Sequence, residues 1–277
     1  MPLFDVLVLI RGAGDLGSGA AYRLVRAGFP VVMTELANPT LVRTTVSYGS
    51  CVLNRTVVVE GIEAQTATPQ TAHQMIEQGM IPVIIDPGRN SIEALRPAVV
   101  VDARVAKTNI DTAIHDALLV VALGPGFTAG VDCHAVVETN RGHNLGRVMW
   151  EGSAEPDTGV PGSVDGKGSE RVLRAPCDGV ITQFVLIGER VTAGTVLANV
   201  GTTPVIAPFD GVLRGMLDSE QVVTAGMKIG DLDPRAKREY CFSPSDKSLA
   251  IGGGVVEAVL SAPQIRTLLS PQKQAMR

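Results

Sequence analysis

The chain has 277 residues, a formal charge of −4 and a mean hydropathy of +0.23. This composition indicates a folded protein of one large or two ordinary domains, without the basic charge typical of nucleic-acid-binding proteins. No apolar run is long enough to span a bilayer, and the four cysteines form no CxxC pair. We therefore expect a cytoplasmic protein with free thiols and no metal site, which binds neither nucleic acid nor a membrane.

The first half of the chain alternates between apolar runs and helical patterns. Strands are expected at residues 4–10, 31–34, 57–60, 81–85, 98–102 and 118–123, and helices at 15–27 and 69–78. Strands alternating with helices predict an α/β fold with a Rossmann-like, doubly wound, mostly parallel sheet over residues 1–150. Binding sites then belong at the carboxyl ends of the strands.

A glycine-rich turn follows the first expected strand. Gly12, Gly14 and Gly17 form a GxGxxG pattern between a strand and a helix, which is typical of a dinucleotide-binding turn. Glu35, at the end of the second strand, is placed to bind a ribose. Asp15 is discordant, because its carboxylate would lie near a phosphate; as an early-helix acid it favours the helix dipole instead. The alternative is that the glycines only pack the helix against the strand.

Polar residues also follow the later strands. The cofactor-binding candidates among them are Arg104, Lys107, Gly124, Gly126, Arg141 and His143. Glycine loops with nearby cations can hold an oxyanion, although each of these residues could instead only stabilise a folded loop. Cys133 and His134 are adjacent, so on an extended chain they point to opposite sides and make a poor catalytic dyad. No catalytic residue is identified.

The second half begins with a linker and contains an internal repeat. Residues 151–170 are rich in Gly, Pro, Ser and acids and predict a domain boundary. Within residues 171–235, the segment APCDGV (175–180) matches APFDGV (207–212), and VTAG recurs with the same offset of 32 residues. Residues 236–277 are expected to pack back on the first domain, with Gly252–Gly254 forming either a phosphate-facing turn or a packing crossover.

The repeat resembles the biotinyl/lipoyl-type barrel-sandwich hybrid, with "APCDGVI…GERVTAGTVL" and "APFDGVL…SEQVVTAGMKI" as its halves. Carrier members of that family present a lysine on the hairpin between the halves. The joining stretch here, "ANVGTTPVI", has none. We therefore expect no covalent biotin or lipoate, and a role for the module in binding or assembly.

The whole chain resembles the selenium-dependent molybdenum hydroxylase system protein family (YqeB type). The resemblance rests on "RGAGDLGSG", "VVMTELANPTLVRTTVSYG", "VVVDARVAK", "LGPGFTAGVDCHAVVETNRGHNLGRV" and "LAIGGGVVEAV". That family is distantly similar to the XdhC/CoxI accessory proteins, in which the glycine motif usually lies in a C-terminal domain rather than near the N-terminus. The resemblance implies an accessory role in molybdenum hydroxylase maturation, with a hydroxylase or its maturation machinery as partner.

Three functions are thus carried forward from the sequence. The first is an accessory protein that binds a nucleotide or a molybdopterin-type cofactor. The second is an NAD(P)-dependent oxidoreductase, in which Glu35 would favour NAD. The third is a scaffold that binds a partner through the β module. The cofactor is accordingly the molybdenum cofactor or NAD(P), and both catalysis and homo-oligomerisation are left open.

Overall fold

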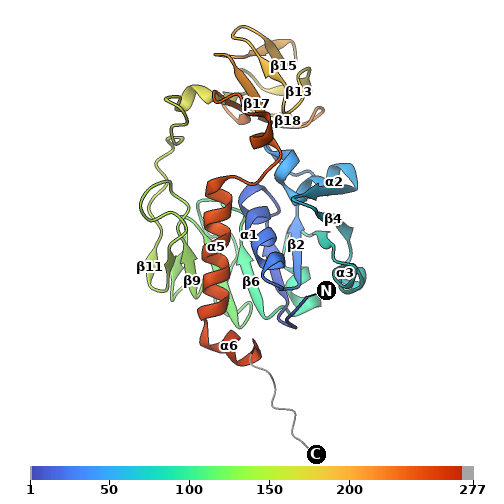
Figure 1. Ribbon diagram of the computed structural model, residues 1–277, viewed down its shortest axis with the longest axis vertical. Helices are drawn as coiled ribbons and strands as arrows, with labels where there is room; N and C mark the ends of the chain where they lie inside the picture. Colours follow the sequence, from blue (N-terminus) through green and yellow to red (C-terminus); the bar gives the residue numbers. More distant parts are fainter. Residues whose placement is uncertain (1, 270–277) are drawn as a thin grey trace, which may run out of the picture.

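The computed structural model describes residues 2–269, and a nine-stranded sheet forms its larger part (Figure 1). The strand order is β10-β9-β7-β6-β1-β2-β5-β4-β3. The strands are β1 (Val8–Arg11), β2 (Val31–Glu35), β3 (Thr56–Val59), β4 (Ile62–Ala67), β5 (Ile81–Ile85), β6 (Val99–Asp102), β7 (Leu119–Leu123), β9 (Ala135–Val137) and β10 (Val148–Met149). The seven inner strands are parallel, whereas β3 and β10 run antiparallel at the two edges.

Helices cover both faces of this sheet. The helices α1 (Asp15–Arg26) and α5 (Asp246–Ser261) share one apolar core with one face, and α3 (Pro69–Glu77) and α4 (Asn90–Leu95) share a second core with the other. Successive residues of β1 alternate between the two cores: Ile10 faces α1, and Leu9 faces α3. Burial on both faces explains why the inner strands read as continuous apolar runs.

Glycine contacts hold α5 against α1 and against the loop between β9 and β10. A methyl group at Gly252 would lie 2.5 Å from the carbonyl oxygen of Gly19, and one at Gly254 would lie 2.3 Å from that of Gly146. Gly253 is exposed and has no neighbour within 4 Å of such a group. The glycine run therefore lies within a packed helix and does not form a phosphate-facing turn.

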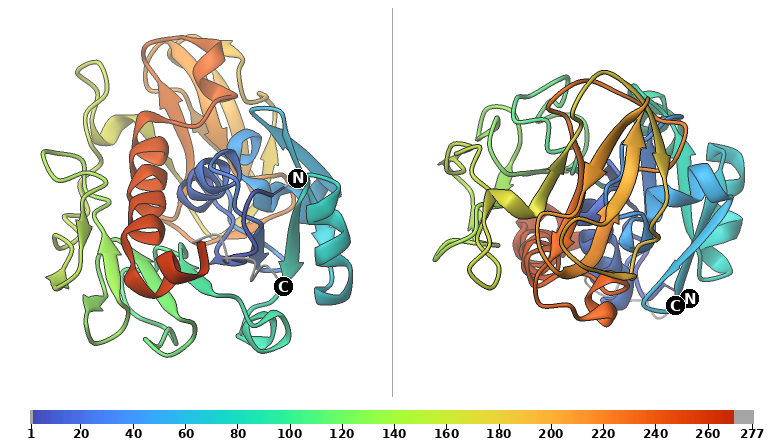
Figure 2. Two further views of the ribbon diagram at one scale, coloured as in Figure 1. Left: turned by 60° about the horizontal axis from the view of Figure 1, so that its bottom comes forward. Right: turned by 90° about the horizontal axis from the view of Figure 1, so that it is seen from above.

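The second part of the chain is a module of two four-stranded antiparallel sheets, ordered β12-β19-β17-β14 and β16-β15-β13-β18. Its strands are β12 (Val172–Arg174), β13 (Gly179–Gln183), β14 (Arg190–Val191), β15 (Val196–Val200), β16 (Thr203–Ile206), β17 (Gly211–Met216), β18 (Val222–Val223) and β19 (Lys228–Asp233). The module lies over the carboxyl ends of the parallel strands (Figure 2).

The 32-residue repeat interlocks the two halves of this module. Asp178 in the first half accepts a hydrogen bond from the backbone N–H of Ala225 in the second half, at 2.7 Å. Its counterpart Asp210 accepts one from the N–H of Ala193 in the first half, at 2.8 Å. Each Asp-Gly turn thus fixes the glycine turn of the other half, which is why both motifs recur together.

Polar contacts attach the module and the segment after it to the first domain. The Gln221 side chain of the module donates to the Pro39 carbonyl oxygen, and the Arg43 guanidinium donates to those of Tyr240 and Ser243 in the segment after β19. Gly215 of β17 lies so close to the Val42 backbone that an added methyl group would be 2.6 Å from its oxygen. The two parts therefore meet in close contact.

The remaining described elements are short. They are α2 (Cys51–Asn54), α6 (Pro263–Leu269), β8 (Thr128–Ala129), β11 (Gly152–Ser153) and the 3₁₀ turns η1 (Thr44–Val46), η2 (Tyr48–Ser50), η3 (Ser169–Arg171) and η4 (Arg238–Cys241). No single helix in residues 2–269 combines the length and apolar composition needed to cross a membrane. Only α5 and α6 taken together, across a bend of 77°, pass that test.

The expected fold class, a doubly wound Rossmann-like sheet, requires correction. The sheet is mixed, because β3 and β10 are antiparallel. It is also not wound by helices throughout: residues 103–118 connect β6 to β7 and residues 124–134 connect β7 to β9 without a helix. The helix that covers this half, α5, comes from the end of the chain.

Candidate functional site

A cavity of about 760 Å³ lies where the module meets the carboxyl edge of the large sheet. Its walls come from the start of α1, the loops after β6 and β9, the linker, β12, β17, β19 and the start of α5. Linker residues 155–162 form one wall. An ion pair of 2.6 Å between Lys107 and Asp157 ties this wall to the loop after β6.

This junction cavity has a large excess of positive charge. Eight described cationic side chains line it, against four carboxylates, in a chain whose formal charge is negative. The cations are Arg43, Lys107, Arg141, Arg171, Arg174, Arg214, Lys228 and Lys247, and the acids are Asp15, Glu155, Asp157 and Asp231. Such a concentration of positive charge attracts anions into a concave site.

Several of these cations already have carboxylate partners. Arg43 pairs with Asp15 at 3.0 Å, and Arg171 pairs with Asp231. Arg141 makes a bidentate pair with Asp246 at the mouth, with N–O distances of 2.7 and 2.8 Å. The charge that remains available to a ligand therefore lies on other residues.

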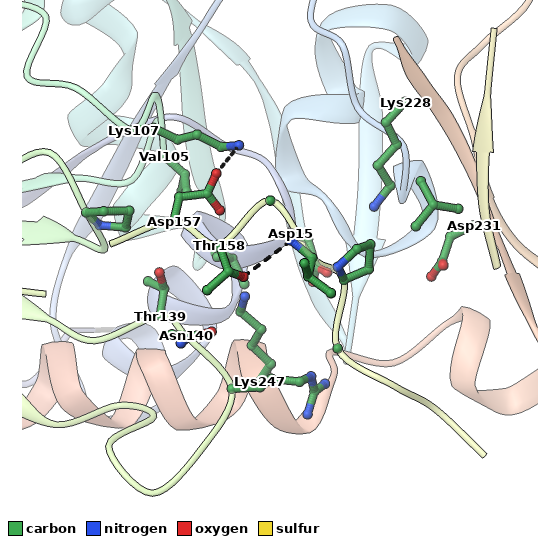
Figure 3. A pocket seen from close by; sticks show the side chains of 18 of the residues that line it. Asp15, Val105, Lys107, Thr139, Asn140, Asp157, Thr158, Lys228, Asp231 and Lys247 are labelled. Atoms are coloured by element: carbon green, nitrogen blue, oxygen red, sulfur yellow. Dashed lines mark hydrogen bonds and ion pairs between the residues drawn. The ribbon is translucent and has the colours of Figure 1, made fainter. Parts of the chain in front are cut away.

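Lys228 and Lys247 carry part of that remaining charge and have no partner at all among the described residues. Their amines enter the cavity from β19 and from the first turn of α5, and neither makes a hydrogen bond or ion pair within residues 2–269 (Figure 3). Although Lys228 is reached by solvent, burial by the surrounding protein lowers its pKa, and that of Lys247 as well. The nearby positive charges of Arg141 and Lys228 lower the pKa of Lys247 further. An anion between these amines would relieve the repulsion.

Arg214 is a further incompletely paired cation of the cavity. It is 92% buried, and its guanidinium lies 3.7 and 3.8 Å from the carboxylates of Asp231 and Asp233. Its Nε has no hydrogen-bond partner in the described part of the chain. Burial and the charge of Arg43 lower its pKa, so the site holds this positive charge at an energetic cost.

A second cavity, of about 490 Å³, lies under the glycine-rich turn and shares Asp15, Leu16 and Val105 with the first. It contains five of the positions predicted from the sequence: Gly12, Gly14, Asp15, Glu35 and Arg104. The other walls are mainly apolar. Asp15, Lys107 and Arg141 are the predicted positions in the junction cavity.

The glycines of the turn have different physical roles. Gly12 has a φ of +98°, and a methyl group there would lie 2.9 Å from the Ala103 backbone. A methyl group on Gly17 would lie 2.1 Å from the Gly12 oxygen, so this glycine permits close helix–strand packing. Gly14 differs from both: its φ is −72°, and the nearest atom to an added methyl group, on Leu41, is 3.6 Å away. Neither steric contact nor backbone conformation requires glycine at position 14, which is the N-cap of α1.

Glu35 and Arg104 are occupied by protein groups. The Glu35 carboxylate accepts hydrogen bonds from the backbone N–H groups of Ala13 at 2.9 Å and Leu36 at 2.8 Å, and so stabilises the glycine-rich turn. Arg104 pairs with Asp102 at 2.6 Å and with Asp111 at 2.8 Å. In this structure both side chains hold the strand-end loops together.

Four predicted positions line neither cavity among the described residues: Gly17, Gly124, Gly126 and His143. Gly124 and Gly126 have φ values of +78° and +100°, and added methyl groups would meet Thr139 and the Lys107 backbone. These two glycines let the loops pack against each other. His143 is exposed.

Cys133 and His134 have structural environments. Burial raises the pKa of the Cys133 thiol to about 12, which leaves it protonated and unreactive at neutral pH. The Nδ1 of His134 accepts a hydrogen bond from the Val120 backbone N–H. Within residues 2–269, no group of three or more His, Cys, Asp and Glu side chains is arranged to hold a metal ion.

Sequence reasoning missed six of the eight cations: Arg43, Arg171, Arg174, Arg214, Lys228 and Lys247. Two of them carried a detectable signal. Arg214 interrupts the buried strand β17, and Lys247 lies in the first turn of a helix, where a positive charge opposes the helix dipole. The others become neighbours only through the docking of the module.

Comparison with known proteins found a relative that matches most of the chain. The Uncharacterized protein YqeB of Escherichia coli (strain K12) is 48% identical over 255 residues, which are 92% of this chain. The chain is a homologue of YqeB. The resemblance to the YqeB type is therefore confirmed, although the chain spans about half the length of that relative, 47%. No family model matches the chain.

Similar solved structures include an aspartoacylase family protein from Mesorhizobium loti MAFF303099, with 11% identity, coverage of 84% and 86% of the two chains, and a TM-score of 0.27. A putative succinylglutamate desuccinylase / aspartoacylase family protein from Shewanella amazonensis SB2B has 13% identity, coverage of 82% and 90%, and a TM-score of 0.27. The succinylglutamate desuccinylase/aspartoacylase from Rhodobacter sphaeroides has 15% identity, coverage of 83% and 86%, and a TM-score of 0.25.

These structural matches correct the expected function and fold names. They name aspartoacylases and desuccinylases, and so do not support a Rossmann-like domain with a barrel-sandwich-hybrid module. They likewise do not support maturation of molybdenum hydroxylases, or the alternatives of an oxidoreductase and a scaffold, and we withdraw these assignments. The TM-scores are too low to transfer the activity of these proteins to this chain.

Proposed function

We propose that this protein binds a small, multiply charged anion in the junction cavity, with phosphate or carboxylate groups between Lys228 and Lys247. The observation that carries the proposal is the excess of positive charge there, eight cations against four acids, with two amines left without a partner among the described residues. The volume of about 760 Å³ is in the range of small-molecule sites.

Isothermal titration calorimetry with inorganic pyrophosphate tests this proposal. Hydrogen bonds to charged groups contribute about 1.5–3 kcal/mol, so Lys228→Met and Lys247→Met should each weaken binding by roughly tenfold or more. Lys237→Met is the matched control, because Lys237 is exposed and lines neither cavity. Unchanged affinity in both cavity variants, or no binding to the wild-type protein, would refute the proposal.

The dependence of binding on pH provides a second prediction. Burial lowers the pKa values of Lys228 and Lys247, so each loses its positive charge at a lower pH than an ordinary lysine, whose pKa is about 10.4. Only the protonated amines attract an anion. As the pH rises, the affinity for sulfate should therefore fall before the pH reaches the ordinary lysine pKa. Sulfate is the suitable probe because its charge is constant over this range. An affinity that stays constant up to the ordinary lysine pKa would contradict the prediction.

Several expectations from the sequence stay predictions. The molybdenum cofactor and NAD(P) both carry phosphate groups and belong among the compounds to be titrated next. A molybdenum hydroxylase or its maturation machinery as partner, a homo-oligomeric state and the distant similarity to XdhC/CoxI proteins also stay predictions. Four free cysteines are compatible with the proposed cytoplasmic location.

A further inference from the structure

We infer that the ligand has two parts: an anionic group in the junction cavity and an uncharged, largely apolar group in the cavity under the glycine-rich turn. This inference rests on the proposed anion site and adds the chemical class of the ligand. In this arrangement the uncharged group of the ligand lies next to the glycine-rich turn, and the anionic group lies in the junction cavity instead of on the turn.

The two cavities adjoin each other. Asp15 and Leu16 at the start of α1, together with Val105 after β6, line both of them. One molecule can therefore extend from the junction with the module to the space under the turn. A ligand that filled only the junction cavity would leave a neighbouring space of about 490 Å³ unused.

The two cavities differ in charge. Three acids, Asp15, Glu35 and Asp86, and two arginines, Arg11 and Arg104, line the cavity under the turn. Both arginines pair with the carboxylate of Asp111 behind its wall. This cavity therefore has no positive charge to spare, whereas the junction cavity has the amines of Lys228 and Lys247, which lack a partner among the described residues. Electrostatics thus places an anion in the junction cavity and an uncharged group under the turn.

The walls under the turn suit an apolar group. Leu16, Leu36, Leu41, Val105 and Ile110 line this space, and Leu36 and Ile110 are exposed by 48% and 61%. Apolar side chains around a concave site gain free energy when a ligand removes them from water. The surface is therefore arranged for a ring or another apolar group.

Gly14 provides an independent observation. Its backbone has an ordinary φ of −72°, and an added methyl group would meet only Leu41 at 3.6 Å. Unlike Gly12 and Gly17, this glycine is not required by packing or by backbone conformation. The space that a side chain would occupy adjoins the cavity, where a ligand can approach the backbone closely.

The ligand class that follows is an organic phosphate or a similar anion that carries an uncharged ring or apolar group. Asp15 lies between the two cavities, and its Oδ1 is buried without a hydrogen-bond partner among the described residues. A hydroxyl or amide N–H in the middle of the ligand is the kind of donor that this oxygen lacks. The negative charge of Asp15 also keeps the anionic group on the side of Lys228.

Titrations with inorganic phosphate and 1-naphthyl phosphate test the inference, because the two probes have similar charge and differ in the apolar ring. We expect 1-naphthyl phosphate to bind the wild-type protein at least tenfold more tightly than phosphate. Gly14→Ala should remove this difference and leave the affinity for phosphate unchanged. Gly253→Ala is the matched control, and thermal unfolding checks that each variant is folded.

A second variant narrows the same space at another lining residue. Ile110→Trp, at an exposed position, should fill the cavity under the turn and remove the tenfold advantage of 1-naphthyl phosphate as well. If the ring gives no advantage, or if the advantage survives in both variants, the two-part ligand is wrong. The anion site is tested separately: weaker phosphate binding by Lys228→Met would support it even if the ring of 1-naphthyl phosphate gave no advantage. Failure of the two-part ligand is therefore distinguishable from failure of the anion site.

Discussion

Substitution of Gly252 by leucine should lower the free energy of unfolding by about 3 kcal/mol. Overpacking typically costs about 1–3 kcal/mol, and the leucine side chain is too large for the close contact between α1 and α5. A single methyl group at this position would already lie 2.5 Å from the Gly19 backbone oxygen. Neither helix backbone can move away without disturbing the core that α1 and α5 share with the sheet. Urea denaturation followed by circular dichroism measures the effect.

Gly253→Leu is the matched control for this prediction. Position 253 is in the same helix, is exposed, and has open space around an added methyl group. Because leucine has a higher helix propensity than glycine, this variant should be slightly stabilised, by roughly 0.5–1 kcal/mol. Equal losses in the two variants would show that the close contact of α1 and α5 is not what the glycine run provides.

Arg11→Met should be similarly severe and should lower the free energy of unfolding by about 3–5 kcal/mol, as for a buried ion pair that loses one partner. Arg11 is 2% exposed and lies at the end of β1. It donates hydrogen bonds to Asp111, Thr112 and the Gly88 carbonyl oxygen. Methionine fills much of the volume but donates no hydrogen bond, so the Gly88 carbonyl oxygen loses this donor and Asp111 and Thr112 keep only Arg104.

The pH dependence of stability separates loss of the ion pair from loss of packing. Burial raises the pKa of Asp111, but hydrogen bonds from Arg11 and Arg104 outweigh it, and the net pKa is lowered. Such a carboxylate contributes stability above its unfolded pKa, about 3.9, and loses it as the pH falls through the folded pKa. Arg11→Met should therefore lose less stability on acidification than the wild-type protein. Arg26→Met, at an exposed position in α1, should match the wild-type protein at every pH.

The local pattern of the sequence was sufficient for most of the large sheet. The strands β5 and β7 lie where continuous apolar runs predict them. Strands that are buried on both faces of a sheet have apolar residues at successive positions. The strand β4 has the sequence IEAQTA, which contains one large apolar residue and gave no such signal. Helix α5 was missed because its three glycines read locally as a turn. Contacts distant in sequence explain two of them: Gly252 packs against α1, and Gly254 packs against Gly146.

The candidate site was less predictable, for a physical reason. Residues of the glycine-rich turn and strand ends can be located from local patterns, since parallel strands bring their carboxyl ends to one edge. Whether these residues are free to bind a ligand depends on partners distant in sequence: Arg104 is engaged by Asp111, and Arg141 by Asp246. The decisive residues Lys228 and Lys247 line one cavity only because the module lies over the sheet edge, which no local pattern encodes.

The most direct test of the anion site is a crystal structure of the protein with bound pyrophosphate. Density for the anion between the amines of Lys228 and Lys247, within hydrogen-bond distance of both, is the result that the account predicts. Density on the glycine-rich turn near Gly12 and Gly14 instead, or an unoccupied junction cavity at saturating pyrophosphate, would contradict it.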